Sequence, residues 1–150
     1  PTGGGNPGMS VRVSAAFRRQ VAEHFAYCCA YCRTAESLSV AIFELEHITP
    51  RSAGGETTFE NICFSCPTCN RYKAHRTSAI GPDTSKEVAL FHPHRDEWDD
   101  HFTWNEDATE IIGLSATGRA TIHALRMNRH QLVRVRRMWV AMGEHPPDTA

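Results

Sequence analysis

The chain has 150 residues, of which 41% are hydrophobic and 22% are charged, and its formal net charge is −1. This composition is typical of a soluble globular protein rather than a disordered one, and no apolar run approaches the roughly 20 residues of a membrane span. The first residues, PTGGGNPGM, have neither the basic nor the apolar region of a signal peptide. We therefore expect a flexible leader over residues 1–10, a single domain over residues 11–150 and a cytoplasmic location.

The first regular element is a helix predicted over residues 14–26. Ser14 is a suitable N-cap, because serine side chains accept hydrogen bonds from the first free amides of a helix. Phe17, Val21 and Phe25 recur at four-residue spacing and so share one face. We expect this face to pack against the segment that follows.

Two Cys-x2-Cys pairs come next, Cys29/Cys32 and Cys66/Cys69. In a reducing compartment such pairs are more often zinc ligands than disulfides, which are the alternative. Four thiolates complete a tetrahedral shell with no open position, so the predicted zinc is structural. Cys28 and Cys63 are expected to be bystanders. Because Cys28 is adjacent to Cys29, however, it stays open which of the two is the zinc ligand in the first pair, which we call the first knuckle.

The segment between the two pairs is longer than the roughly 15–20 residues of a simple zinc ribbon, so it must fold by itself. Residues 40–47 are rich in strand formers, and residues 48–55 contain Pro50, Gly54 and Gly55, which favour a loop. Residues 59–64 return the chain to the second pair, and a short helix is predicted from Pro67. These elements make a small ββα unit held by zinc.

The same stretch reads Cys-x2-Cys, then Glu-His-Ile-x-Pro-Arg-x2-Gly-Gly, then Glu-Asn-Ile-x3-Cys-x2-Cys-Asn-x2-Lys. This pattern resembles the HNH endonucleases, which have a ββα-metal core, and especially the members with a four-cysteine zinc site. The resemblance implies an α+β nuclease domain with its core over residues 29–77, a C-terminal extension over residues 78–150, and flanking helices at both ends.

The residues that give the family its name correspond here to His47, Asn61 and Asn70, so the chain is similar to the HNN variant. By this resemblance His47 is the general base, and Asn61 holds the loop that carries it. Glu46 and Asn70 would hold a catalytic Mg²⁺ or Mn²⁺, to which an asparagine offers its amide oxygen. The plainer alternatives are that Asn61 bridges a turn and that Asn70 is only a polar residue at a helix start.

His75 also follows the motif and is a possible replacement for the missing histidine. Because five helical steps turn the chain by about 140°, we expect His75 not to share the metal with Asn70. Candidate contacts to nucleic-acid phosphates are basic residues in and beyond the motif, namely Arg51, Lys73, Arg126 and Arg134. The alternative is a solvated side chain for Lys73 and a solvated helix face for Arg126 and Arg134.

Beyond the motif, residues 78–86 are predicted to be a linker-like loop, and residues 102–104 and 110–114 a hairpin. A histidine-rich segment lies between them, and it offers a second metal site as a weak alternative through His92, His94, Asp96 and His101. The aromatic residues there are expected to anchor the segment to the core. Residues 117–142 carry an amphipathic helical stripe, and no acidic residue occurs between Glu110 and Glu144.

Together these features predict a metal-dependent nuclease that hydrolyses phosphodiester bonds in DNA, leaving a 5′-phosphate and a 3′-hydroxyl as the resemblance implies. The expected cofactors are structural Zn²⁺ and catalytic Mg²⁺ or Mn²⁺, the expected partner is DNA, and no membrane partner is expected. Two alternatives stay open: a zinc-stapled nucleic-acid-binding module without catalysis, and a zinc-stabilised interaction domain.

Overall fold

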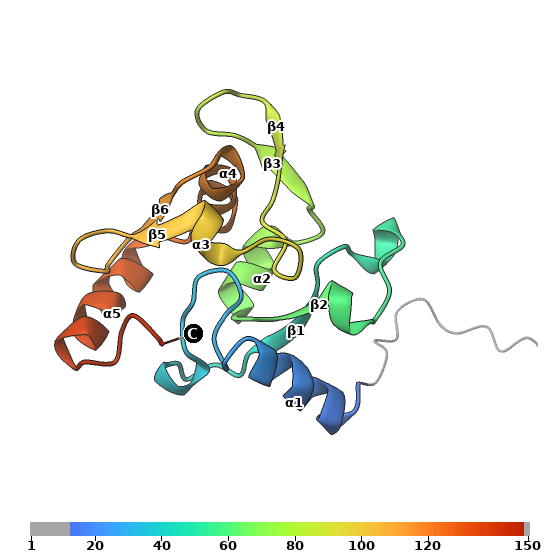
Figure 1. Ribbon diagram of the computed structural model, residues 1–150, viewed down its shortest axis with the longest axis horizontal. Helices are drawn as coiled ribbons and strands as arrows, with labels where there is room; N and C mark the ends of the chain where they lie inside the picture. Colours follow the sequence, from blue (N-terminus) through green and yellow to red (C-terminus); the bar gives the residue numbers. More distant parts are fainter. Residues whose placement is uncertain (1–12, 149–150) are drawn as a thin grey trace, which may run out of the picture.

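The structure is a computed structural model that describes residues 13–148, so the leader expected over residues 1–10 lies outside the described part. Helices and short antiparallel strand pairs are mixed along the chain, which confirms the predicted α+β class (Figure 1). Among the described residues, no helix combines the length and the apolar character needed to cross a bilayer.

Helix α1 (Ala15–His24) begins where the sequence predicts, because the Ser14 hydroxyl accepts a hydrogen bond from the Phe17 amide at 3.1 Å. Its buried residues, Val21 and Ala22, face the core, and the helix packs against strand β2 (Ile62–Ser65). After the helix the chain turns sharply through two residues of positive φ and enters the first cysteine knuckle.

The ββα unit consists of β1 (Glu44–His47), β2 and α2 (Pro67–Lys73), with His47 opposite Ile62 and Glu46 opposite Cys63. The strand predicted over residues 40–47 is therefore shorter than expected. Its partner ends at Ser65, opposite Glu44, because α2 starts immediately afterwards. Val40 and Ile42 are consequently unpaired and exposed. Short 3₁₀ turns fill the connections, at η1 (Glu36–Leu38), η2 (Arg51–Ala53) and η3 (Phe59–Asn61).

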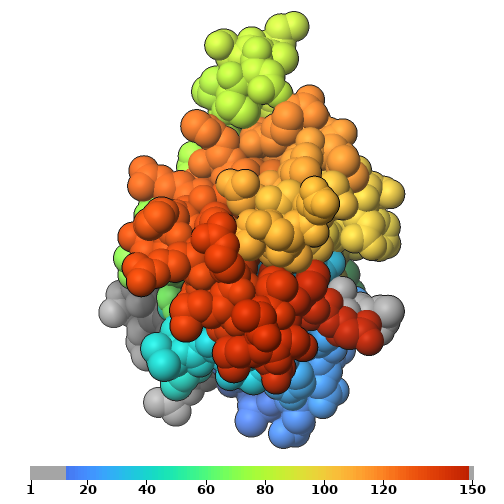
Figure 2. Space-filling model, turned by 90° about the vertical axis from the view of Figure 1, so that its left-hand side faces the viewer, coloured from blue at the N-terminus to red at the C-terminus, as the bar shows by residue number. Residues whose placement is uncertain are grey.

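The loop predicted over residues 78–86 is confirmed only for residues 81–86, because Ser78–Ile80 forms strand β3, which pairs with β4 (Glu87–Ala89) in a hairpin. The Gly81 amide donates to the Lys86 carbonyl at 2.7 Å and closes the turn. Strands of three residues are too short to show an alternating pattern, which explains why the sequence did not reveal them. The tip of this hairpin stands out from the body (Figure 2).

The second predicted hairpin is confirmed as β5 (Phe102–Trp104) paired with β6 (Ile111–Gly113), and it follows the short helix α3 (Trp98–His101). The aromatic anchors also behave as expected, with Phe91, Trp98 and Phe102 buried. The Trp98 indole donates to the Tyr31 carbonyl at 2.9 Å and so ties this segment to the first knuckle.

The C-terminal helical region is divided into α4 (Ala116–Leu125) and α5 (His130–Ala141). The break is stabilised by Asn128, whose side chain bonds both backbone groups of Ile111, at 2.7 and 2.8 Å. Arg136 is fully buried against the Trp104 ring and donates to the Met127 carbonyl at 2.8 Å. One of the basic residues of this region is thus part of the core.

Candidate active site and zinc clamp

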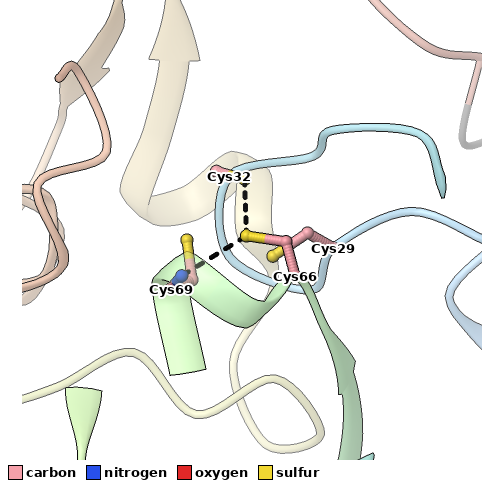
Figure 3. A group of neighbouring side chains, drawn as sticks. All are labelled: Cys29, Cys32, Cys66 and Cys69. Carbon is pink, nitrogen blue, oxygen red and sulfur yellow. Dashed lines mark hydrogen bonds between the residues drawn. The ribbon is translucent and has the colours of Figure 1, made fainter. Parts of the chain in front are cut away.

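The four paired cysteines converge on one point, where the loop after α1 meets the start of α2 (Figure 3). The sulfur atoms of Cys29, Cys32, Cys66 and Cys69 all lie within 4.8 Å of one another, and all four residues are buried. Cys32 and Cys66 are 3.8 Å apart. Four sulfurs about 2.3 Å from a tetrahedral zinc are separated by about 3.8 Å, so the group fits this ion.

The pKa values of the buried thiols shift in opposite directions. Burial raises the pKa of the Cys29 thiol, whereas hydrogen bonds from Cys29, Cys66 and Cys69 hold the pKa of Cys32 well below its usual range. Cys28 and Cys63 lie outside the group, which answers the open question at the first knuckle in favour of Cys29. We call the four ligands the zinc clamp.

Next to the clamp, one face of the ββα unit is hollowed into a cavity of about 290 Å³. Its lining joins β1, the following loop and α2, and it includes His47, Glu46, Arg51, Asn70 and His75. Three of these are candidate catalytic or metal-binding residues from the sequence. We call this hollow the HNH cavity.

His47 is held at the end of β1 by the loop that follows it. Its Nε2 lies 2.9 Å from the Thr57 hydroxyl, a partner that the sequence analysis did not identify. Burial, reinforced by the charge of Arg51, lowers the pKa of His47 below 6.5. The imidazole is therefore mainly neutral at neutral pH, the form that accepts a proton.

Asn61 lies outside the lining of the HNH cavity and bridges the loop between β1 and β2. Its side chain accepts from the Thr49 amide at 2.9 Å and donates to the carbonyls of Thr49 and Glu56, at 3.0 and 2.9 Å. A Cβ atom on Gly55 would lie 1.9 Å from the Thr49 carbonyl oxygen, so only glycine permits this close approach. The loop after His47 is thereby fixed at several points.

Glu46 sits at the floor of the cavity with its carboxylate directed into the core. Its Oε1 is 2.6 Å from the Lys73 ammonium, and its Oε2 accepts from the Tyr31 hydroxyl at 2.7 Å and the Cys63 thiol at 3.1 Å. The Lys73 and Glu46 side chains are only 1% and 3% exposed. Lys73 was expected to contact nucleic acid, and this is wrong, because burial and the ion pair keep its ammonium away from the surface.

Asn70 reaches the cavity from α2, and its amide nitrogen donates to the carboxylate of Glu44. Glu44 lies two residues before Glu46 and therefore on the same face of β1, a signal that was visible in the sequence but not used. His75 also lines the cavity. The separation of about 140° from Asn70 applied to a continuous helix, but α2 ends at Lys73 and Ala74 has a φ of 52°.

No second metal centre is assembled in the described part of the chain. Within residues 13–148, the clamp is the one group of three or more Cys, His, Asp or Glu side chains with ligand atoms this close together. His94 instead contacts the Ile62 carbonyl at 2.8 Å, and His101 contacts the Ser115 hydroxyl at 2.6 Å. The weak alternative of a metal site in the histidine-rich segment therefore gains no support.

The two arginines proposed from the C-terminal region differ in their surroundings. Arg126 ends α4 in a left-handed conformation and stacks on the Tyr72 ring, 4.6 Å from its centroid. Arg134 is exposed in the middle of α5. The break between the helices thus places Arg126 beside α2, whereas Arg134 lies on a separate surface.

Comparison with known proteins agrees with the motif. Residues 29–76 match the family model described as HNH endonuclease. No curated protein and no solved structure matches the chain. A match to this family indicates a nuclease or a nucleic-acid-binding function. The resemblance found in the sequence is therefore confirmed over residues 29–76, which match the HNH endonuclease family model, and the four cysteines within this segment fit a zinc site.

Proposed function

We propose that the protein is a metal-dependent endonuclease that hydrolyses phosphodiester bonds in DNA. The observation that carries the proposal is the HNH cavity, because His47, Asn70 and Arg51 line it together within the segment that matches the family. A base, an oxygen ligand and a positive charge are the groups that phosphodiester hydrolysis requires close to one phosphate.

In the proposed mechanism His47 takes a proton from the water that attacks the phosphorus atom. Its lowered pKa keeps the ring neutral at neutral pH, and Thr57 holds Nε2 so that the ring orientation is fixed. In the described residues Nδ1 has no hydrogen-bond partner, which leaves one ring nitrogen for the proton. The products implied by the family resemblance are a 5′-phosphate and a 3′-hydroxyl.

Asn70 and Glu46 would hold the catalytic Mg²⁺ or Mn²⁺. Both line the cavity, and carboxylate and amide oxygens are the ligands that these hard cations prefer. Because both Glu46 oxygens are engaged by Lys73, Tyr31 and Cys63, one of these contacts would have to open for Glu46 to bind the cation. The Asn70 nitrogen is engaged by Glu44, so its Oδ1 is the atom that remains for the cation. When bound, the cation supplies charge neutralisation at the phosphate.

Arg51 and Asn61 complete the proposed site in different ways. Arg51 lines the cavity beside His47 and is suited to bind a phosphate oxygen. Asn61 acts at a distance from the substrate, since its bonds to Thr49 and Glu56 hold the loop that carries these residues. It is a positioning residue rather than a catalytic one.

The direct test is nicking of a supercoiled plasmid in Mg²⁺ and in Mn²⁺ by the parent protein and by His47→Ala. We expect the substitution to lower the rate by about 10²–10⁴, the usual contribution of a general base. His130→Ala makes the same chemical change at an exposed position on α5 and should cut like the parent. Equal cutting by parent and His47→Ala would exclude His47 as the base.

One observation favours a second candidate, a nucleic-acid-binding module without catalysis. The Glu46 carboxylate is already balanced by Lys73, so a cation at Glu46 has to compete with a buried ammonium. Binding of DNA by the parent without any cleavage in Mn²⁺ would favour this candidate. Absence of DNA binding would favour the interaction domain instead.

A further inference from the structure

A second hollow, of about 630 Å³, lies between the end of α2 and the end of α4. The hollow is lined by residues at the ends of these two helices and in the turns that follow them. The lining consists of Tyr72, Arg76, Ile122, His123, Ala124, Arg126, Asn128 and Arg129. None of these side chains is acidic. We call this hollow the arginine pocket.

Within residues 13–148, no carboxylate forms an ion pair with any of the three arginines of the pocket. Over residues 13–148 the structure contains two ion pairs, Lys73 with Glu46 and Arg119 with Asp83, and neither involves the pocket. The absence of acidic residues between Glu110 and Glu144 explains this from the sequence. Arg76 and Arg126, which have no acidic partner, create a local positive potential at the hollow that attracts phosphate, whereas the charge of Arg129 also faces the sulfurs of the zinc clamp.

Arg76 and Arg126 are held in place by neutral groups, whereas Arg129 also lies 4.0 Å from the Cys66 sulfur. Arg126 stacks on Tyr72 and lies 3.4 Å from its hydroxyl, and Arg76 donates to the Lys73 and Ala124 carbonyls, both at 3.3 Å. Arg129 donates to the Arg126 carbonyl at 3.2 Å. Carbonyl and ring contacts orient a guanidinium without cancelling its charge, so the pocket is preorganised for an anion.

The pocket and the HNH cavity lie on two flanks of the same helix. Asn70 lines the cavity and Tyr72 lines the pocket, and successive residues of a helix are about 100° apart. Arg71, between them in the sequence, is exposed. A polyanion with one phosphate in the cavity would have to pass around α2 to reach the pocket, and Arg71 adds an exposed positive charge to that helix.

We infer that the arginine pocket binds a backbone phosphate of the DNA strand whose cleaved phosphate occupies the HNH cavity. The inference rests on the proposed function for the identity of the strand. It assigns a task to the C-terminal extension, since Arg126 and Arg129 lie outside the segment that matches the HNH family. The pocket would contact a phosphate and not a base, so it would add affinity for DNA without adding sequence preference.

The test is equilibrium binding of a short fluorescent DNA duplex without added divalent cation, over a range of KCl concentrations. The double variant Arg76→Gln/Arg126→Gln should bind at least about tenfold more weakly at about 0.1 M salt, with a salt slope shallower by about two phosphate contacts. The control variant Arg19→Gln/Lys86→Gln removes the same charge from exposed positions outside the pocket. It should change neither the affinity for DNA nor the salt slope strongly. Equal losses in the two double variants, or no loss in either, would overturn the inference.

Folding is controlled separately, because Arg76 contacts backbone carbonyls at the end of α2 and in α4. Zinc content and melting temperature are measured for each variant, and Arg126→Glu alone repeats the test, since its guanidinium contacts only the Tyr72 side chain. Arg129 is left unchanged, because it lies 4.0 Å from the Cys66 sulfur of the clamp. Arg126→Glu should show the larger loss of affinity per residue, and normal DNA binding by this variant would overturn the inference.

Two further arms separate this inference from the proposed function and from a simple anion site. Hydrolysis of a small phosphodiester, which fills only the HNH cavity, should be unchanged in Arg126→Glu. If the parent cleaves nothing but DNA binding still depends on the pocket, the nuclease proposal fails and the phosphate pocket stands. If the parent binds no DNA, or if inorganic phosphate binds the pocket while DNA binding ignores Arg126→Glu, the inference fails.

Discussion

The zinc clamp and the HNH cavity are neighbours on α2, yet they are built in different ways. The clamp has its four sulfurs buried within 4.8 Å of one another, whereas the cavity is lined partly by exposed residues such as Arg51 and His75, and its candidate cation ligands are engaged with protein groups. Cys69 and Asn70 are adjacent in the chain and belong to one site each. A structural ion requires a closed shell, while a catalytic ion requires positions that substrate and water can occupy.

This difference means that the clamp supports the cavity and not the reverse. The clamp fixes the start of α2, and α2 in turn places Asn70 on the cavity wall. Damage to the clamp should therefore abolish both folding and cutting. Damage to the cavity should abolish cutting and leave the fold intact.

The largest effect is expected from loss of the clamp. Cys32→Ser, or removal of zinc by a strong chelator, should unfold the ββα unit, since a structural zinc contributes about 10–16 kcal/mol to folding in small zinc domains. Circular dichroism and zinc analysis measure the fold, and plasmid nicking measures the activity. Full nicking by a verified zinc-free preparation would show that the cavity does not depend on the clamp.

The second effect concerns the buried pair below the cavity. Lys73→Met leaves the Glu46 charge without its partner and should reduce stability by about 3–5 kcal/mol. The double variant Glu46→Leu/Lys73→Met removes both charges and should recover most of that stability, but not the nicking activity. Urea denaturation of the two variants measures the difference, and an equally large loss in both would argue against a buried ion pair.

The third effect separates the two carboxylates of β1. Glu46→Gln should abolish cleavage in Mg²⁺ and Mn²⁺ if Glu46 holds the cation, whereas Glu44→Gln should reduce it by less than about tenfold through the lost contact with Asn70. Cleavage rates over a series of Mn²⁺ concentrations measure the effect, with zinc content as the control for folding. An inactive Glu44→Gln beside an active Glu46→Gln would transfer the ligand role to Glu44.

A smaller effect is expected for the loop bridge. Asn61→Asp keeps the oxygen that accepts from Thr49 but cannot donate to the Thr49 and Glu56 carbonyls, which should cost about 1–3 kcal/mol. The turnover number should fall more than the affinity for DNA, because the loop positions His47 and does not itself bind DNA. Stability by denaturation and single-turnover cleavage test this, and a change in affinity alone would speak for a direct substrate contact.

The smallest effect is in the pH dependence. Cleavage should rise with pH through the pKa of His47, with its midpoint below 6.5, because burial and Arg51 lower that pKa and the neutral ring is the base. Arg51→Gln removes the second of these causes but not the first, so the midpoint should move upward and stay below 6.5. NMR titration of the His47 ring measures the pKa directly, and a midpoint above 6.5 in the parent would contradict the assigned cause.

The sequence by itself determined the parts of the protein that depend on local spacing. The Cys-x2-Cys pairs predicted the clamp, Ser14 predicted the start of α1, and turn residues predicted the β5–β6 hairpin. The nuclease motif was likewise visible as a pattern of fixed intervals, and the family comparison confirms it over residues 29–76. Such features require only neighbours along the chain.

Tertiary structure alone decided where the charged and polar side chains point. Lys73 is buried because Glu46 lies opposite it, His75 joins the cavity because α2 ends early, and Asn128 divides the C-terminal helical region because Ile111 is within reach. Each of these outcomes depends on a partner distant in sequence. A charge on a short helix fits a solvated face and a buried ion pair equally well until the opposing strand is in place.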